Sequence, residues 1–334
     1  MARFDKYLAG ILAFLGVAGP LPARAAEPAA PQATAVGGHI LGLKPICDAC
    51  KPERFATGFQ DLLEGPTFDR DGNLLVLGII KGNIWRVTPD GHASIAIALP
   101  PEIKFPAGLR FAPDGTLYGV AMGSGVFTVD LATKKATLVA NGVYLHGLPE
   151  GGFHGLDDLF FDHSGGMYAT DAAGSGALRP IGQVLYRDPG GDFRRIVPDG
   201  LAFPNGIVLS PDEKTLYISE WGRNQILAAP VVGPGVINLT MSYVFARLSG
   251  GHGPDSITAD ADGNIYAAHY GSREVAIFAP DGDYYGAIQL PAEAGSEPTN
   301  VAFHNGYLYI VESEKGEVWR VKTKIKGIKL YGGS

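Results

Sequence analysis

Four oxygen-bearing side chains recur at the same distance from a repeated turn. Asn205 lies seven residues before Asp212, in a Ser-Pro-Asp-Glu turn. The same offset from three similar turns selects Glu64, Asp157 and Asp255. Three carboxylates that converge on one point repel one another unless a cation lies between them. All four donors are hard oxygens, without His or Cys. The set therefore predicts one divalent metal, with Ca²⁺ favoured, Mg²⁺ or Mn²⁺ as alternatives, and Zn²⁺ the least suited.

Four protein ligands leave coordination positions for water and substrate, which a catalytic metal requires. A carboxylate beside such a metal can take the proton from water. We expect Asp255 to be the catalytic base while also binding the metal, and Asp158 is the second choice. Neighbouring residues of a strand point to opposite sides, so Asp158 has a structural alternative, a contact between blades. The alternative for the whole set is a group of ordinary acidic turn residues.

These residues converge only if the chain repeats. Six turns recur at intervals of 43 to 50 residues, each between short runs rich in β-branched and aromatic residues, and they begin at Asp71, Asp114, Ser164, Asp212, Asp262 and Asn305. Helical periodicity is almost absent, and units of this length with several strands are typical of a β-propeller. The sequence therefore predicts an all-β, six-bladed β-propeller, with residues 53–59 as the outer strand of the last blade. A β-sandwich with coincidental turns is the alternative.

In a propeller the first strand of each blade lines the central channel, so the residue before it faces one mouth. We call the six residues at this position, one from each repeat, the column. Its two other members are Ala107 and Thr299. Substrate contacts are expected from loops at the same mouth, and the candidates are His154, Trp221, Arg223, His269 and Tyr270. His154 could shuttle protons or be a structural histidine. The aromatic candidates, with Ile79 and Ile80, favour a partly apolar pocket.

The N-terminus predicts export. Basic residues precede a short apolar core, and Ala23-Arg24-Ala25 offers a signal-peptidase site. We expect a signal peptide over 1–25, a flexible extension with a CxxC motif over 26–51, the propeller over 52–334, and a periplasmic or secreted protein. A retained N-terminal anchor is the alternative. For Cys47 and Cys50 an oxidising compartment favours a local disulfide over a redox-active pair.

The charge balance excludes two classes of partner. The full chain has a formal net charge of −7, and removal of residues 1–25 makes it more negative. Nucleic acids and anionic membranes bind preferentially to basic protein surfaces, so neither is expected to bind this protein. The expected partner is a small molecule, and the oligomeric state is left open.

The repeat units resemble a known family. The stretches "LEGPTFDRDGNLLVLGIIKGNIWRVTPDG", "GLDDLFFDHSGGMYATD", "FPNGIVLSPDEKTLYISEW" and "GPDSITADADGNIYAAHYG" resemble the senescence-marker-protein/gluconolactonase family of six-bladed propellers, over about residues 53 to 331. The resemblance implies one divalent metal at the channel mouth and, as substrate, a small-molecule lactone or ester, mostly a lactone of a sugar acid. The aromatic candidates, with Ile79 and Ile80, favour one that is bulkier or less polar than a simple sugar lactone. It places metal ligands at Glu64, Asn205 and Asp255. Where the family has Asn-Asp, this chain has Asp157-Asp158, which adds a negative charge.

The sequence therefore predicts an exported, metal-dependent lactonase, a carboxylic ester hydrolase of gluconolactonase type. One alternative is a non-catalytic propeller that binds a ligand or a protein, because the fold serves both purposes. Another is a propeller hydrolase or lyase for a different ester-like substrate.

Overall fold

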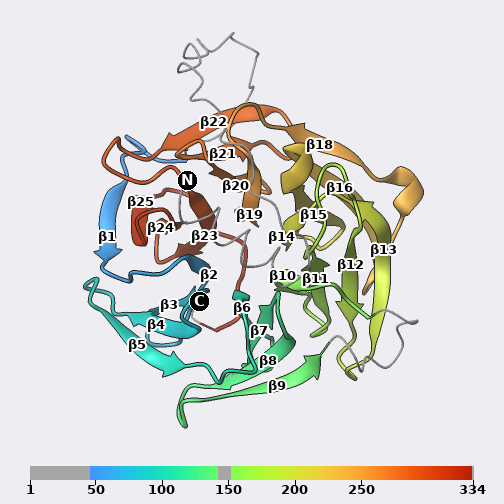
Figure 1. The fold of residues 1–334 in the computed structure, drawn as a ribbon. Coiled ribbons are helices and arrows are strands. Elements are labelled where there is room, and N and C mark those ends of the chain that lie inside the picture. Colours follow the sequence, from blue (N-terminus) through green and yellow to red (C-terminus); the bar gives the residue numbers. More distant parts are fainter. Residues whose placement is uncertain (1–45, 142–151, 333–334) are drawn as a thin grey trace.

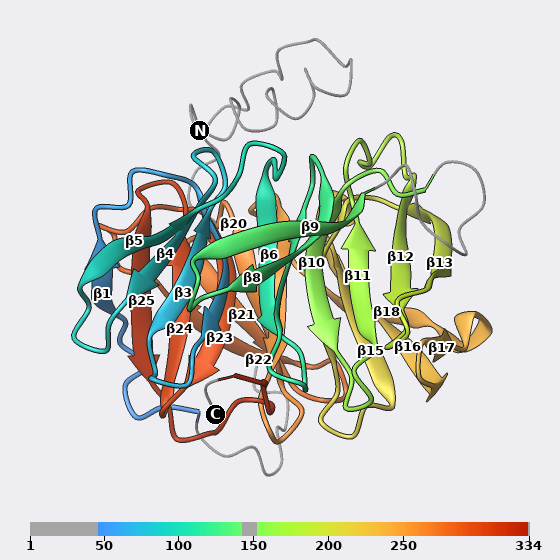
Figure 2. The same ribbon diagram turned by 90° about the horizontal axis from the view of Figure 1, so that it is seen from below.

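Each sequence repeat forms one antiparallel sheet, and six such sheets stand around a central channel (Figure 1). The computed structural model describes residues 46–141 and 152–332. The prediction of an all-β, six-bladed β-propeller is confirmed. Seen from the side, the inner strands run from one mouth of the channel to the other (Figure 2). The first strand of every sheet is buried along its length, apart from one residue at the end of the sixth, because it packs against its neighbours around the channel.

The first three sheets are regular four-stranded meanders, ordered from the channel outward. The first contains β2 (Leu63–Phe68), β3 (Leu74–Gly78), β4 (Asn83–Val87) and β5 (Ala93–Ala98). The second contains β6 (Pro106–Phe111), β7 (Leu117–Ala121), β8 (Gly125–Asp130) and β9 (Lys135–Asn141). The third contains β10 (Leu156–Phe161), β11 (Met167–Asp171), β12 (Gly182–Arg187) and β13 (Phe193–Leu201).

The last three sheets show two variations. The fourth contains β14 (Pro204–Leu209), β15 (Thr215–Glu220) and β16 (Gln225–Gly233), and β16 pairs with both β17 (Val236–Ile237) and β18 (Tyr243–Arg247). The fifth contains β19 (Gly253–Ala259), β20 (Ile265–Tyr270), β21 (Glu274–Phe278) and β22 (Tyr284–Gln289). The sixth contains β23 (Pro298–His304), β24 (Tyr307–Glu312) and β25 (Glu317–Lys322), and its outer strand is β1 (Glu53–Thr57). Two 3₁₀ turns are η1 (Trp221–Arg223) and η2 (Leu239–Met241).

The pairing of β1 with β25 joins the two ends of the described chain in one sheet. The strands are antiparallel, with Glu53 opposite Arg320 and Thr57 opposite Glu317. Just before β1, Cys47 and Cys50 form a disulfide. At the other end, residues 325–332 cross the mouth where the C-terminus lies in Figure 2, and they form bridges to Asp260 and Phe111 at the ends of inner strands.

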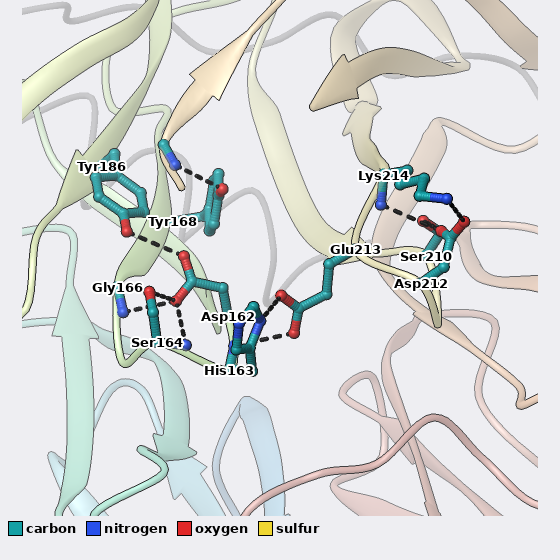
Figure 3. A network of polar contacts seen from close by, with 11 residues as sticks. Asp162, His163, Ser164, Gly166, Tyr168, Tyr186, Ser210, Asp212, Glu213 and Lys214 are labelled. Carbon is teal, nitrogen blue, oxygen red and sulfur yellow. Dashed lines mark hydrogen bonds and ion pairs between the residues drawn. The ribbon is translucent and has the colours of Figure 1, made fainter. Parts of the chain in front are cut away.

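In the first, third and fifth sheets, a carboxylate directly after the inner strand accepts hydrogen bonds from the backbone amides of the repeated turn. In the third sheet, Asp162 accepts hydrogen bonds from the backbone amides of Ser164 and Gly166 and from the hydroxyl of Tyr186 (Figure 3). Asp69 and Asp260 bind the amides of their own turns in the same way. In the second and fourth sheets Asp114 and Asp212, within the turn itself, accept from the amides of Thr116 and Lys214. Such local side-chain bonds favour a tight turn.

The other end of each inner strand is irregular at the position that the sequence column marks. Pairing of the first two strands shifts in every sheet, between Glu64 and Thr67, Pro106 and Gly108, Leu156 and Leu159, Pro204 and Ile207, Pro254 and Ile257, and Pro298 and Asn300. A β-bulge bends a strand and redirects a side chain. The six breaks therefore lie together at one mouth of the channel.

No helix within the two described ranges is long and apolar enough to cross a bilayer.

Candidate active site

The four predicted metal ligands lie together at the channel mouth opposite the repeated turns. Glu64 comes from β2, Asp157 from β10, Asn205 from β14 and Asp255 from β19, and all four line one pocket. Their side chains are buried, with 4% to 7% of each residue exposed. The other lining residues are Leu62, Ile79, Phe203, Trp221, Thr299 and Ser313. Four strand starts far apart in the sequence thus build one acidic floor.

The three carboxylates of the floor resist ionisation. Burial raises the pKa of Glu64 and of Asp255 well above their usual values, and the charges of the other site carboxylates add to both rises. Burial, with the charge of Asp158 added, raises the pKa of Asp157 to about 8. Asn205 donates a hydrogen bond to Asp255, which opposes the rise there. Three buried acids therefore share a small volume in which ionisation needs a cation.

Asp158 occupies a different layer from its neighbour Asp157. Its carboxylate accepts hydrogen bonds from the Ser256 hydroxyl at 2.7 Å and from the Leu159 amide at 2.8 Å, and the Ile207 amide approaches at 3.4 Å. It does not line the pocket. The buried Arg110 guanidinium lowers the pKa of Asp158, against the larger opposing effect of burial. Asp158 thus joins the third, fourth and fifth sheets, the blade contact that the sequence analysis set against a catalytic role.

Arg110 is a buried cation that the sequence column did not reveal. It lies on β6, with 4% of the residue exposed, and its Nε approaches the Leu159 carbonyl at 3.4 Å. Its charge lowers the pKa of Asp158, which lies outside the pocket. The charge of the guanidinium therefore compensates the charge of Asp158. The three floor carboxylates have no cationic partner among the described residues.

Hydroxyl groups hold the peptides that carry the ligands. Thr170 donates to the carbonyl of Asn205 at 2.6 Å, and Ser219 donates to the carbonyl of Asp255 at 2.5 Å. Ser313 donates to the carbonyl of Leu63, next to Glu64, at 2.7 Å. Each donor belongs to the preceding sheet in the ring. The bonds position each ligand relative to the neighbouring blade, as a preorganised site requires.

A second set of carboxylates braces the loops that lead into the inner strands. Asp171 accepts from the amides of His154 and Gly155, and Glu220 accepts from the amide of Ala202. Glu312 does the same for the Glu297 amide and for two amides that follow it. These three lie 13 to 15 residues after the column member of their own sheet. A search for a second column at that offset would have found them.

The five predicted substrate contacts divide into three groups. Trp221 lines the pocket. Tyr270 and His269 are buried, and Tyr270 packs against Trp221 with ring centroids 6.3 Å apart, so it supports the wall from behind. Arg223 is bound to Glu220 and to the carbonyl of Gly200, and the exposed His154 holds Asp171 through its backbone amide. Neither of these last two lines the pocket.

Phe203, which the sequence analysis did not single out, lines the pocket together with Trp221. Phe203 has a backbone φ of +55°, an uncommon conformation for an aromatic residue. Its amide donates to the Ser175 hydroxyl oxygen at 3.1 Å, and its carbonyl accepts from the Trp221 amide at 3.0 Å. The rings of Phe203 and Trp221 lie 5.6 Å apart. The sequence motif Phe-Pro-Asn-Gly marked Asn205 and did not show that the Phe two residues earlier faces the pocket.

The donor chemistry of the floor fits a hard divalent cation. Three carboxylates and one amide supply oxygen ligands alone, which Ca²⁺ and Mg²⁺ prefer. Among the described residues, no three His, Cys, Asp or Glu side chains meet in the arrangement of an assembled metal centre. Binding of an ion therefore requires the floor side chains to turn toward a common point, and the gain is relief of the cost of ionising buried acids.

The fold and the acidic channel mouth define a class of six-bladed propellers, and the comparisons give the family. Residues 62–324 match the model of the SMP-30/Gluconolactonase/LRE-like region. The chain belongs to this family, which confirms the resemblance in the sequence. It is 34% identical to the lactonase drp35 of Staphylococcus aureus over 242 residues, covering 69% of this chain and 70% of that protein.

Solved structures show the same fold. The chain is similar to a gluconolactonase from Xanthomonas campestris, with a TM-score of 0.67 and 21% identity over 81% of this chain and 88% of that one. It is also similar to a calcium-binding regucalcin from Agrobacterium tumefaciens, with a TM-score of 0.66 and 22% identity over 81% and 92% of the two chains.

The raised carboxylate pKa values predict that metal-free protein loses stability as the pH rises. An acid whose pKa is higher in the folded state binds more protons there, so the free energy of unfolding falls between its unfolded and folded pKa values. For Asp157 the window runs from its usual 3.8 to about 8. We expect a loss of about 1.4 kcal/mol per pH unit for each such acid, and recovery on addition of Ca²⁺.

Urea unfolding at pH 5, 6.5 and 8, in EDTA or in Ca²⁺, measures this effect. The difference between the two solutions is the informative quantity, because Glu312, whose pKa burial raises to about 7, titrates in both. An Asp157→Asn variant should show a smaller difference at pH 8. Equal stability at pH 5 and pH 8 in EDTA would contradict the expectation.

Proposed function

We propose that this protein is a metal-dependent hydrolase that opens a lactone ring. The observation that carries the proposal is the floor of the mouth pocket. There three buried carboxylates, which have no cationic partner within residues 46–141 and 152–332, line a single space together with one amide. Membership of a family that includes named lactonases supports the reaction type. Glu64, Asp157, Asn205 and Asp255 are the proposed metal ligands.

Lactone opening needs a polarised carbonyl, an activated water and a proton for the departing ring oxygen. A divalent cation bound by the floor would polarise the carbonyl and stabilise the oxyanion that forms. Asp255 lines the pocket and takes the proton from water as general base. Asp158 is the weaker choice for that role, because Ser256 and Arg110 already engage its carboxylate outside the pocket. The proton then passes to the leaving alkoxide.

Calcium is the metal that we propose. The floor offers oxygen atoms alone, and Ca²⁺ accepts mixed carboxylate and amide ligands in flexible geometry, whereas Mg²⁺ demands a near-ideal octahedron. The contributing side chains come from four separate strands, so their spacing can adapt to the larger ion. Mg²⁺, Mn²⁺ and Zn²⁺ are the competitors that a metal titration compares.

The proposal predicts lactone turnover that a chelator abolishes. A panel of sugar, alkyl and aryl lactones is assayed with purified protein, after dialysis against EDTA and again after addition of Ca²⁺, Mg²⁺, Mn²⁺ or Zn²⁺. We expect turnover of at least one lactone, loss of at least about 100-fold in EDTA, and recovery with Ca²⁺, because the metal supplies most of the oxyanion stabilisation. Chelator-insensitive turnover would contradict the metal, and ligand binding without any turnover would favour the non-catalytic propeller.

We also propose that the protein is exported and processed after Ala25. That segment lies outside the described residues. The Cys47–Cys50 disulfide supports an oxidising compartment. N-terminal sequencing of the protein recovered from a periplasmic or culture fraction should begin at Ala26, and recovery of the intact N-terminus in the membrane fraction would favour a retained anchor.

A further inference from the structure

We propose that the pocket prefers lactones whose ring carries an alkyl or aryl substituent over polyhydroxylated sugar lactones, and that Phe203 and Trp221 determine this preference. The inference rests on the proposed function, since it names the substrate class of the same site. Its basis is the chemistry of the pocket walls above the acidic floor.

The walls are apolar on two opposite sides of the channel. In the fourth blade Phe203 directly precedes β14 and Trp221 directly follows β15. In the first blade Leu62 precedes β2 and Ile79 follows β3. The first and fourth sheets face each other across the ring (Figure 1). A substrate ring whose ester group reaches the floor is therefore flanked by hydrocarbon on both sides. Burial of matching apolar surface is the main favourable contact that such walls offer.

The remaining polar side chains of the wall are already used within the protein. Thr299 donates its hydroxyl proton to the Leu63 carbonyl at 2.8 Å, and Ser313 donates to the same carbonyl at 2.7 Å. The Ser313 oxygen also accepts from the Leu63 amide at 2.9 Å. The other polar lining groups are the four floor ligands and the indole N–H of Trp221. The hydroxyl protons of Thr299 and Ser313 are thus already engaged, so the several hydroxyls of a sugar lactone compete for few partners outside the floor, and a buried hydroxyl without a partner is costly.

The aromatic wall is held rigidly in place. Trp221 packs against Tyr270 and His252, with centroids 6.3 Å and 6.0 Å away. Gly253 lies beneath it, where an added Cβ would stand 2.2 Å from the Trp221 carbonyl oxygen. Phe203 adopts its φ of +55° with backbone bonds to Ser175 and Trp221. Strained conformations that the surroundings maintain are concentrated at ligand sites, and here the strain directs a large ring into the pocket.

Phe105 provides a matched comparison within the same chain. It precedes Pro106 in the second sheet as Phe203 precedes Pro204 in the fourth, and its φ is +53°. Phe105 packs behind Leu62 and Ile79 and does not line the pocket. The two phenylalanines therefore share backbone strain and differ in access to substrate.

The test compares three lactones with the same six-membered ring: δ-valerolactone, a δ-lactone with a propyl group on the ring, and D-glucono-1,5-lactone. Hydrolysis is measured with Ca²⁺ present, after subtraction of the spontaneous rate. We expect kcat/KM for the propyl compound to exceed that for the sugar lactone by at least about 10-fold, since each buried CH₂ contributes roughly fourfold. The unsubstituted ring should fall between them.

Variants then assign the effect to the wall. Asn tolerates positive φ well, so Phe203→Asn keeps the backbone and removes the ring. We expect it to raise KM for the propyl lactone about 10-fold, with kcat and the sugar-lactone values within about threefold, because the substituent is bound remotely from the reacting ester. Phe105→Asn should leave all three profiles within about threefold. Binding of an unreactive propyl δ-lactam, measured by calorimetry, should weaken about 10-fold in Phe203→Asn alone.

The outcomes separate this inference from the proposed function. Turnover with the sugar lactone preferred overturns the inference and leaves lactone hydrolysis standing. Equal effects of Phe203→Asn and Phe105→Asn overturn the role of Phe203, because they would report general destabilisation. No hydrolysis of any of the three compounds overturns the proposed function and the inference together.

Discussion

Replacing Asp255 by Asn is expected to lower kcat for lactone hydrolysis by about 10³-fold or more, because one carboxylate serves as both general base and metal ligand. Asn keeps the size of the side chain and cannot accept a proton. The Asn205 hydrogen bond to this position can still form through the amide oxygen. Steady-state kinetics on the best lactone of the panel, at saturating Ca²⁺, measures the effect.

Asp158→Asn is the matched control. Asp158 lies outside the pocket and is bound to Ser256 and near Arg110. We expect this variant to be less thermally stable, because loss of the Asp158 charge leaves the buried Arg110 without a counter-charge. Such a change typically lowers the free energy of unfolding by several kcal/mol. Its kcat per folded molecule should fall much less than that of Asp255→Asn. The reverse order would assign the base to Asp158.

The double variant Glu64→Gln, Asn205→Ala is expected to lose metal binding. It removes one of the four donors, at Asn205, and replaces the Glu64 carboxylate by a neutral amide, which takes away one of the three floor charges. We expect the Kd for Ca²⁺, measured by calorimetry, to rise by about 100-fold or more, since affinity for Ca²⁺ depends on ligand charge and number. Exposed Glu102, changed to Gln, removes the same charge away from the site and should leave the Kd unchanged.

The Glu64→Gln change by itself provides a folding control. Glu64 is a buried acid whose pKa is raised well above its usual value, so its replacement by a neutral amide removes repulsion from the metal-free protein. The stability of the Glu64→Gln single variant in EDTA at pH 8 should therefore be retained or improved, whereas Asn205→Ala also removes the hydrogen bond to Asp255. Full metal occupancy in the double variant would refute the assignment of the ligands.

The repeated turns made most of the architecture predictable. Each turn depends on contacts between residues two to four positions apart, such as those of Asp69 with its own loop. Because these contacts are local, they require particular residues at fixed spacing. The resulting turn motif therefore recurs once in each repeat of the sequence. Counting back from this motif also found Glu64, Asp157, Asn205 and Asp255, because each inner strand begins at the same point of its repeat.

The sequence by itself thus determined the six sheets, the channel mouth and the acidic residues that meet there. Only the tertiary structure separated Asp157, in the pocket, from Asp158, which binds Ser256 and lies near Arg110. Only the tertiary structure placed Phe203 beside Trp221. These relations join side chains from different sheets, and they depend on how neighbouring blades pack and on one positive φ. Spacing along the chain carries no record of such packing, so the wall of the pocket and the balance of its charges became visible only in three dimensions.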